Sequence, residues 1–233
     1  MLPSPLAPTV LPATLSVATA FLPPLAALWA RRSLAEPAGR VAVCWLVMAA
    51  FGAFNMAWYY LGLPLPSLYS SEIVTAAFPV LLLPPTLRWI GGSARRWQWP
   101  ALLVWLAVWG VGVVSFHDTR EFKSIVESVM SAALCVASVW ALAARIHESP
   151  SELRRTDWFW ILTGHVMYFA INMFRGPLIE ALVARHWGAL LAVNAAILLL
   201  YSLTYVVIAR GMLVRPAASS RPRGGVARIA QTA

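Results

Sequence analysis

Four polar residues with helical spacing lie inside an apolar stretch near residue 170. They fall at positions i, i+3, i+7 and i+10, and they are His165, Tyr168, Asn172 and Arg175. On an α-helix these spacings place all four side chains on one face. Lipid offers no hydrogen-bonding partner, so such a face must meet protein or a water-filled cavity. This polar stripe therefore predicts either a binding site for a polar solute or hydrogen bonds that hold a helix bundle together.

Other apolar stretches carry polar residues that are candidate partners of the polar stripe. These candidates are Asn55 and Tyr59, then Glu127, then Asn194 and Tyr201. A carboxylate near the edge of a membrane is costly unless it is paired. Arg175 is the nearest cation at the depth of Glu127, so the sequence predicts an ion pair between them, with Glu72 and Glu180 as competitors. The alternative is that both side chains extend to the interface and stay solvated.

Several catalytic and cofactor chemistries lack the residues that they need. Cys44 and Cys135 are the two cysteines, and neither belongs to a C-x-x-C motif. A retinal Schiff base needs a lysine in the last apolar stretch, whereas the single lysine is Lys123. Only His165 among the histidines lies inside an apolar stretch, which argues against a bis-histidine haem. Clustered metal ligands and nucleophile or phosphate-loop motifs are lacking too, so we expect no enzyme, no cofactor and no metal.

Composition indicates which elements must position these residues. The chain has 233 residues, of which 60% are hydrophobic and 12% are charged, and its mean hydropathy is +0.71. Soluble domains carry roughly 25% charged residues, so this composition indicates a membrane protein. A helix needs about 20 apolar residues to cross a bilayer. By that measure the sequence predicts seven membrane spans, at about 9–30, 41–61, 72–90, 99–115, 125–145, 158–174 and 188–209.

The predicted fold class is an all-α integral membrane protein, a seven-transmembrane-helix bundle. Residues 1–210 form its transmembrane domain, and residues 211–233 form a disordered, arginine-rich tail. No basic residue precedes the first apolar stretch, so we expect a retained span rather than a cleaved signal peptide. A weak echo between residues 54–56 and 171–173 fits a 3+1+3 arrangement of repeats, although chance similarity explains it equally well.

Basic residues mark one side of the predicted membrane. Fourteen fall in alternate gaps or the tail, namely Arg31, Arg32, Arg40, Arg88, Arg95, Arg96, Arg145, Arg154, Arg155, Arg210, Arg215, Arg221, Arg223 and Arg228. The remaining gaps hold four, namely Arg120, Lys123, Arg175 and Arg185. Cytoplasmic loops carry the excess of basic residues in membrane proteins. The N-terminus is therefore expected outside and the C-terminus in the cytoplasm.

Two further patterns concern helix packing. Small residues recur at spacings of four and three along one stretch, at Ser124, Ser128, Ser131, Cys135 and Ser138. Small side chains let two helices approach closely, so we interpret this seam as a packing surface rather than a binding site. Two proline pairs, at residues 23–24 and 84–85, predict kinks in the first and third spans.

These observations lead to three functional hypotheses. The first is a small-solute binding protein or carrier with an outward-facing polar pocket, in which His165 could couple binding to protons. Its predicted ligand contacts are Asn55, Tyr59, Glu127, His165, Tyr168, Asn172, Arg175, Asn194 and Tyr201. The alternative is a non-catalytic structural subunit or scaffold of a larger membrane complex. A second alternative is a membrane sensor that signals through a separate partner.

Composition also bounds the location and the partners. The preference for arginine and alanine over lysine suggests a GC-rich bacterial genome, so we expect a multi-pass protein of the bacterial inner membrane. The expected partners are the lipid bilayer, anionic lipids at the arginine-rich tail, and a small-molecule ligand. A membrane-protein partner or a second copy of the chain also fits. The net charge of +9 comes from basic residues beside apolar stretches, so it does not indicate nucleic-acid binding.

Overall fold

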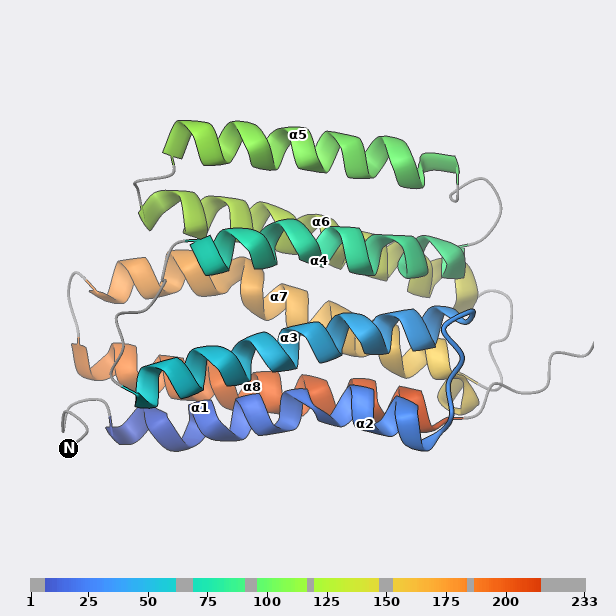
Figure 1. Cartoon of the computed structure of the whole chain (residues 1–233), viewed down its shortest axis with the longest axis horizontal. Coiled ribbons are helices and arrows are strands. Elements are labelled where there is room, and N and C mark those ends of the chain that lie inside the picture. Colours follow the sequence, from blue (N-terminus) through green and yellow to red (C-terminus); the bar gives the residue numbers. More distant parts are fainter. Residues whose placement is uncertain are drawn as a thin grey trace, which may run out of the picture.

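The computed structural model describes residues 7–61, 69–90, 96–116, 120–146, 153–183 and 187–214. Throughout these ranges the regular structure is helical and contains no strand. The elements are α1 (Ala7–Ala20), α2 (Leu22–Trp29), α3 (Pro37–Tyr60), α4 (Tyr69–Ile90), α5 (Gln98–Phe116), α6 (Arg120–Ile146), the short 3-10 helix η3 (Leu153–Arg155), α7 (Asp157–Val183) and α8 (Trp187–Leu213). The long helices lie side by side in one elongated bundle, with α5 at one edge (Figure 1).

Five helical stretches are long and apolar enough to cross a membrane. They are Val10–Trp29, Pro37–Trp58, Ile125–Ile146, Asp157–Val183 and Gly188–Leu213. Two shorter apolar stretches, Ala76–Ile90 and Gln98–Gly112, belong to α4 and α5. The predicted all-α fold is thus confirmed, and the five candidate spans suggest a membrane protein. That all seven apolar stretches cross the bilayer stays a prediction.

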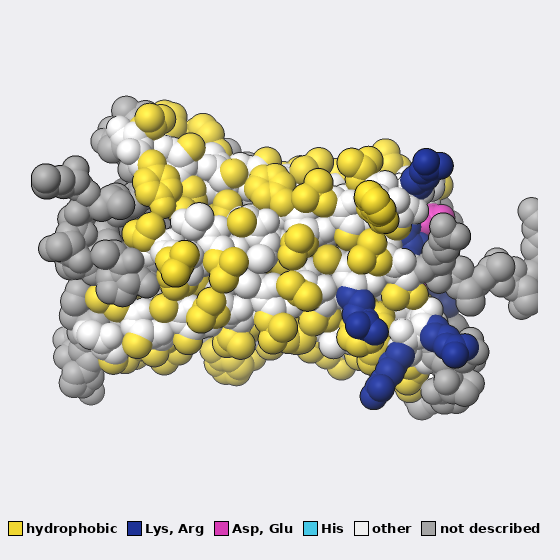
Figure 2. Space-filling view, turned by 90° about the horizontal axis from the view of Figure 1, so that it is seen from below, with side chains coloured by type: hydrophobic (Ala, Val, Ile, Leu, Met, Phe, Trp, Pro, Cys, Tyr) yellow, Lys and Arg dark blue, Asp and Glu magenta, His cyan; other side chains and the backbone are white. Residues whose placement is uncertain are grey.

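The surface of the bundle fits a lipid environment. Figure 2 shows apolar side chains spread along the face seen there, with Lys and Arg side chains gathered near one end. Large apolar residues are well exposed in the middle of several helices, for example Leu103, Val111 and Val136. In water such a surface would be an unusually large exposed apolar area, whereas hydrocarbon solvates it.

Prolines shape the helices differently from one span to the next. The first span divides at Phe21 into α1 and α2, because Pro23 and Pro24 cannot donate backbone hydrogen bonds and occupy the first turn of the new helix. In contrast, α4 continues as helix through Pro84 and Pro85, and α7 continues through Pro177. The sixth predicted span therefore ends at Val183 rather than near residue 174.

The contact between α7 and α8 is close because glycines face side chains across it. A Cβ added at Gly164 would meet Ile208, and one at Gly211 would lie 2.6 Å from Ile161 Cγ1 and 2.9 Å from the carbonyl oxygen of Asp157. Gly211 falls in the region assigned to the tail from sequence. It belongs instead to the last turn of α8, where packing against α7 orders it, and residues 215–233 of the predicted tail lie outside the described ranges.

Candidate functional site

The polar stripe of α7 runs from the interior of the bundle toward one end. His165 is 0% exposed, Tyr168 is 9% exposed and Asn172 is 4% exposed, whereas the Arg175 side chain is 35% exposed. The helical spacing therefore turns the stripe toward neighbouring helices, and only its last member reaches the surface. The stripe is bordered by α6 on one side and α8 on the other.

Aromatic rings fill the interior around Tyr168. The centroid of its ring lies 4.9 Å from Trp45 of α3, 5.1 Å from Tyr201 of α8 and 6.0 Å from Tyr205 of α8. Phe78 of α4 contacts both Trp45 and Tyr168, at 5.8 and 5.9 Å. These spacings are those of packed aromatic pairs. The middle of the stripe is thus part of an aromatic core that joins α3, α4, α7 and α8.

His165 is fixed within this core by one hydrogen bond. The indole Nε1–H of Trp45 donates to His165 Nε2 at 3.3 Å. Because Nε2 accepts, the ring proton is on Nδ1 in this arrangement. Nδ1 is buried and finds no hydrogen-bond partner in the part of the chain that the structure describes. The histidine therefore has one satisfied and one unsatisfied nitrogen inside the bundle.

Asn172 uses both ends of its side-chain amide, the oxygen to join α7 to α8 and the nitrogen within α7 itself. The Tyr201 hydroxyl donates to Asn172 Oδ1 at 2.7 Å, and Asn172 Nδ2 donates to the backbone oxygen of Tyr168 at 3.1 Å. Tyr201 is 5% exposed, so the pair is shielded from solvent. These bonds use the polar atoms in the way expected of packing contacts between membrane helices.

Glu127 and Arg175 lie close together at the exposed end of the stripe. Glu127 Oε1 is 4.0 Å from Arg175 Nη1, and the two side chains are 27% and 35% exposed. The guanidinium carbon of Arg175 lies 5.9 Å from the ring centroid of Tyr201. The structure therefore brings the two charges together as the sequence predicted, in a loose and partly exposed contact that we call the Arg175 pair.

Not every predicted ligand contact joins this group. Asn55 of α3 and Asn194 of α8 are partly exposed, and neither forms a hydrogen bond or ion pair that the structure describes. Tyr59 lies in α3, and its side chain is outside the described part of the structure. The side chain of Glu72 in α4, a predicted competitor for Arg175, is outside it as well.

Trp45 and Phe78 belong to the core around the polar stripe, although the sequence did not indicate either residue. Trp45 is 0% exposed and contacts His165, Tyr168 and Tyr205. Tryptophan in membrane helices is enriched at the water boundary. Trp45 is the fifth residue of the predicted span 41–61, so its position in the sequence matches that boundary and gave no signal that its ring lies in the core.

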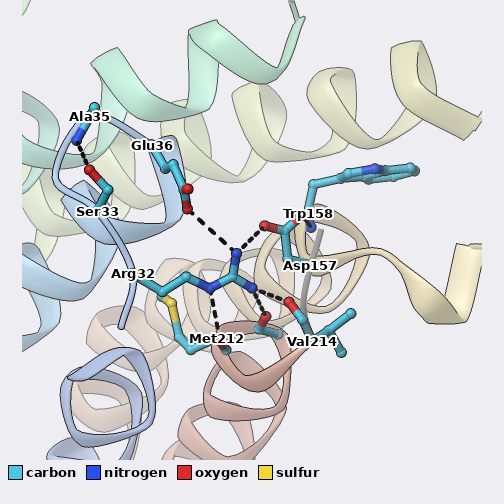
Figure 3. Close-up of polar contacts among 9 residues, drawn as sticks. Arg32, Ser33, Ala35, Glu36, Asp157, Trp158, Met212 and Val214 are labelled. Carbon is cyan, nitrogen blue, oxygen red and sulfur yellow. Dashed lines mark hydrogen bonds and ion pairs between the residues drawn. The ribbon is translucent and has the colours of Figure 1, made fainter. Parts of the chain in front are cut away.

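A second charged cluster lies at the opposite end of α7 and centres on Arg32. Arg32 Nε donates to the Met212 carbonyl at 2.9 Å, and Nη1 donates to Asp157 Oδ2 at 3.2 Å. Nη2 donates to the carbonyl oxygens of Gly211 and Val214, and Glu36 Oε2 lies 3.6 Å from Nη1. Figure 3 shows the guanidinium enclosed between these groups. We call this group the Arg32 cluster.

Local backbone geometry explains how Arg32 reaches α8. Arg31 has φ of 53°, a left-handed conformation that reverses the chain directly after α2. The side chain of Arg32 is then directed to the end of α8, whose last carbonyls have no partner within the helix. In the sequence Arg32 is one of the basic residues that indicate topology, whereas the structure shows its side chain 4% exposed and hydrogen-bonded on every nitrogen.

Two cavities lined by described residues lie away from the polar stripe. One, of about 260 Å³, lies between α2 and α3 and includes Leu25, Leu46 and Arg32 in its lining. The other, of about 340 Å³, lies between α4 and α5 and includes Val80, Leu106 and Trp109. Neither is lined by a residue of the stripe, so neither is the predicted outward-facing polar pocket. Both are largely apolar and open to the sides of the bundle.

The remaining chemistry of the described residues is limited. No group of three or more His, Cys, Asp and Glu side chains is placed to hold a metal ion within these residues. The site that the geometry offers is therefore the Arg175 pair above the Asn172–Tyr201 hydrogen bond. Comparisons with protein-family models, with curated proteins and with solved structures find no match for this chain.

Proposed function

We propose that the chain is a seven-span protein of the bacterial inner membrane that binds a small charged solute at the Arg175 pair. The seven spans are supported by the lengths of α4 and α5, which have 22 and 19 residues. At a rise of 1.5 Å per residue each is about 30 Å long, the thickness of the hydrocarbon core. Both lie alongside the other long helices (Figure 1).

The orientation with the N-terminus outside rests on where basic side chains gather. Arg88 Nη1 donates to the Ala35 carbonyl, and Arg145 Nε donates to the Trp89 carbonyl. These contacts lie at the end of the bundle that also holds the Arg32 cluster. Basic residues concentrate on the cytoplasmic side of membrane proteins, so this end is the inner one. The Arg175 pair is then at the outer end.

Reporter fusions test this orientation. A fluorescent protein that folds only in the cytoplasm should fluoresce when it follows the full-length chain and stay dark when it precedes Met1. The reverse result would place the Arg175 pair on the cytoplasmic side. A fusion in the connection between α3 and α4 serves as a second outer position and should also stay dark.

The observation that carries the binding function is the incomplete coordination of Arg175. Among the described residues its ion-pair contact is the one with Glu127, which is 4.0 Å long, and about a third of the side chain is exposed. A partly buried guanidinium with unused donors is a ready site for a carboxylate or phosphate. Tyr201 and Asn172, held by their 2.7 Å hydrogen bond, form the floor beneath it. The packed aromatic core below favours a solute that binds from the outer side. The solute could pass through the bundle only if this core rearranged.

Thermal stability of the purified chain in detergent tests the binding function. A panel of small anions, zwitterions and cations should contain solutes that raise the melting temperature of the wild type. Arg175→Gln should abolish the shift. The matched control is Arg154→Gln, which removes the same charge from an exposed position at the other end of the bundle and should leave the shift intact. If both variants respond like the wild type, the Arg175 pair is not the site.

The structural-subunit hypothesis is the second candidate, and it is supported by the hydrogen bonds inside the bundle. Trp45–His165 and Tyr201–Asn172 use polar atoms of the stripe for packing. In that case no solute should shift the melting temperature. The chain should instead purify, under native conditions, in a complex of defined stoichiometry that is lost when exposed α5 side chains such as Leu103 are replaced by bulkier ones.

A further inference from the structure

Two serine hydroxyls of α6 are buried close to the Arg175 pair and find no hydrogen-bond partner among the described residues. They belong to Ser128 and Ser131, and Ser131 is 0% exposed. Other buried hydroxyls of the bundle donate to a carbonyl one turn earlier in their own helix, as Thr86, Ser138 and Ser202 do. A buried hydroxyl without a partner is unfavourable unless something else supplies one. A bound ligand can therefore supply the hydrogen-bond partner that the hydroxyls of Ser128 and Ser131 lack.

The register between α6 and α7 places these hydroxyls beside the Arg175 pair. Glu127 contacts Arg175 at 4.0 Å, and Cys135 Sγ lies 3.9 Å from the Val166 carbonyl, so the two helices are antiparallel at this contact. Glu127, Ser131 and Cys135 follow one another at intervals of four residues and share the α7-facing side. Ser131 thus lies one turn deeper than Glu127, and Ser128 lies on the adjoining position of the same face.

The charges of the site favour a ligand that carries both signs. An anion without a positive group would be attracted by Arg175 but repelled by Glu127. A cation without a negative group would be attracted by Glu127 but repelled by Arg175. A molecule with an ammonium and a carboxylate group satisfies both side chains. Hydroxyl donors add to this, because a carboxylate accepts short, strong hydrogen bonds from them.

We propose that the solute is a zwitterion of the amino-acid type, an inference that rests on the solute-binding function proposed above. Its carboxylate binds Arg175 and the hydroxyls of Ser128 and Ser131, and its ammonium binds Glu127. The small-residue seam of α6 then has two parts. Ser128 and Ser131 face the ligand, whereas Cys135 and Ser138 remain packing residues, as their contacts with backbone carbonyls show.

Matched small molecules test the chemical class on the wild-type chain alone. Apparent affinities are measured from melting shifts of the full chain in detergent, with alanine, phenylalanine and glycine as probes. Alaninamide, N-acetylalanine, propionate and ethylamine each lack one of the two charges. Loss of one charge-assisted contact should weaken binding by about 10- to 100-fold relative to the parent amino acid.

Serine variants locate the carboxylate contact. Ser131→Ala should weaken binding of the amino acid by about 10-fold and should not lower the ligand-free melting temperature, because the hydroxyl has no partner to lose. Ser138→Ala is the matched control in the same helix. It removes a hydroxyl that already donates to the Leu134 carbonyl at 2.7 Å, and it should leave the affinity unchanged.

The possible failures are distinguishable. If propionate binds as tightly as alanine and Glu127→Gln strengthens binding, the site takes anions; the zwitterion inference is then wrong and the solute-binding function stands. If Ser131→Ala binds like the wild type while Arg175→Gln does not bind, the serine contact is wrong. If no zwitterion, anion or cation in the panel shifts the melting temperature, the inference and the solute-binding function are both overturned.

Discussion

Two arginines near opposite ends of α7 differ in almost every respect. Arg32 is 4% exposed and donates to three backbone carbonyls and to the carboxylate of Asp157. Arg175 is 35% exposed, and the ion pair that it makes among the described residues is the 4.0 Å contact with Glu127. A buried guanidinium is tolerated only when its donors are satisfied, so Arg32 has none left for a ligand. The comparison separates an arginine whose donors are satisfied within the fold from a more exposed arginine, at which we propose the binding site.

The Arg32 cluster also satisfies two helix ends at once. The last carbonyls of α8 accept from Arg32, and a cation at the C-terminus of a helix is favoured by the helix dipole. Asp157 begins α7, where a carboxylate is favoured for the opposite reason. Since Arg32 follows α2, this one side chain joins the N-terminal helices to the last two helices of the bundle.

Removal of Arg32 should produce the largest effect. Arg32→Ala leaves Asp157 poorly exposed without its partner and the carbonyls of α8 uncapped, which should cost about 3–5 kcal/mol of unfolding free energy. Arg32→Lys keeps the charge but not the forked geometry and should recover only part of that loss. Thermal unfolding in detergent measures both. An Arg32→Ala variant as stable as the wild type would remove the contrast between the two arginines.

The glycine beside the Arg32 cluster tests the close packing at the same end. Gly211→Ala would place a Cβ 2.9 Å from the Asp157 carbonyl oxygen, so α7 and α8 must separate. We expect a loss of about 1–3 kcal/mol, the usual cost of overpacking. Gly110→Ala in α5 is the control, since its Cβ would meet nothing within 4 Å, and it should gain up to about 1 kcal/mol from helix propensity. Equal melting temperatures for the two variants would contradict this packing.

Tyr201→Phe tests the hydrogen bond between Tyr201 and Asn172, which lies next to the Arg175 pair. It removes the hydroxyl that donates to Asn172 Oδ1 at 2.7 Å and leaves that buried oxygen without this donor. The expected loss is about 1–2 kcal/mol, smaller than for Arg32 because no charge is left unpaired. The control is Phe54→Leu, which changes an exposed ring of α3 and should leave the stability nearly unchanged. Phe169→Leu would not serve, because Phe169 lies in the core. If Tyr201→Phe leaves the free energy of unfolding unchanged, this bond does not hold Tyr201 and Asn172 in place beneath the site.

Arg175→Gln should have the smallest effect on stability. The contact with Glu127 is long and both side chains are partly exposed, so its loss should cost less than about 1 kcal/mol. Ligand-free thermal unfolding measures this, and raised salt should change the wild type little. A loss as large as that of Arg32→Ala would show that the Arg175 pair is a structural contact, and it would favour the structural-subunit hypothesis.

Periodicity was sufficient to predict the helices and the polar face of α7. Apolar stretches of about 20 residues and the positions of His165, Tyr168 and Asn172 depend only on local spacing. The ion-pair partner of Arg175 was also predictable, because depth in the membrane limits which charges can meet. Proline effects were less predictable, since Pro23 and Pro24 begin a new helix while Pro84, Pro85 and Pro177 remain inside one. Which of these outcomes occurs depends on neighbouring helices.

Local sequence patterns are enough to predict an all-helical chain, its apolar stretches, the segregation of its basic residues and the polar stripe. Which polar atoms already have hydrogen-bond partners depends on how the helices pack against one another. Arg32 and Arg175 look alike in sequence, as basic residues beside apolar stretches, and Ser131 and Ser138 look alike in the small-residue seam. Their differences arise from the register of α6 against α7 and from the chain reversal at Arg31, both of which depend on contacts between residues far apart in the chain.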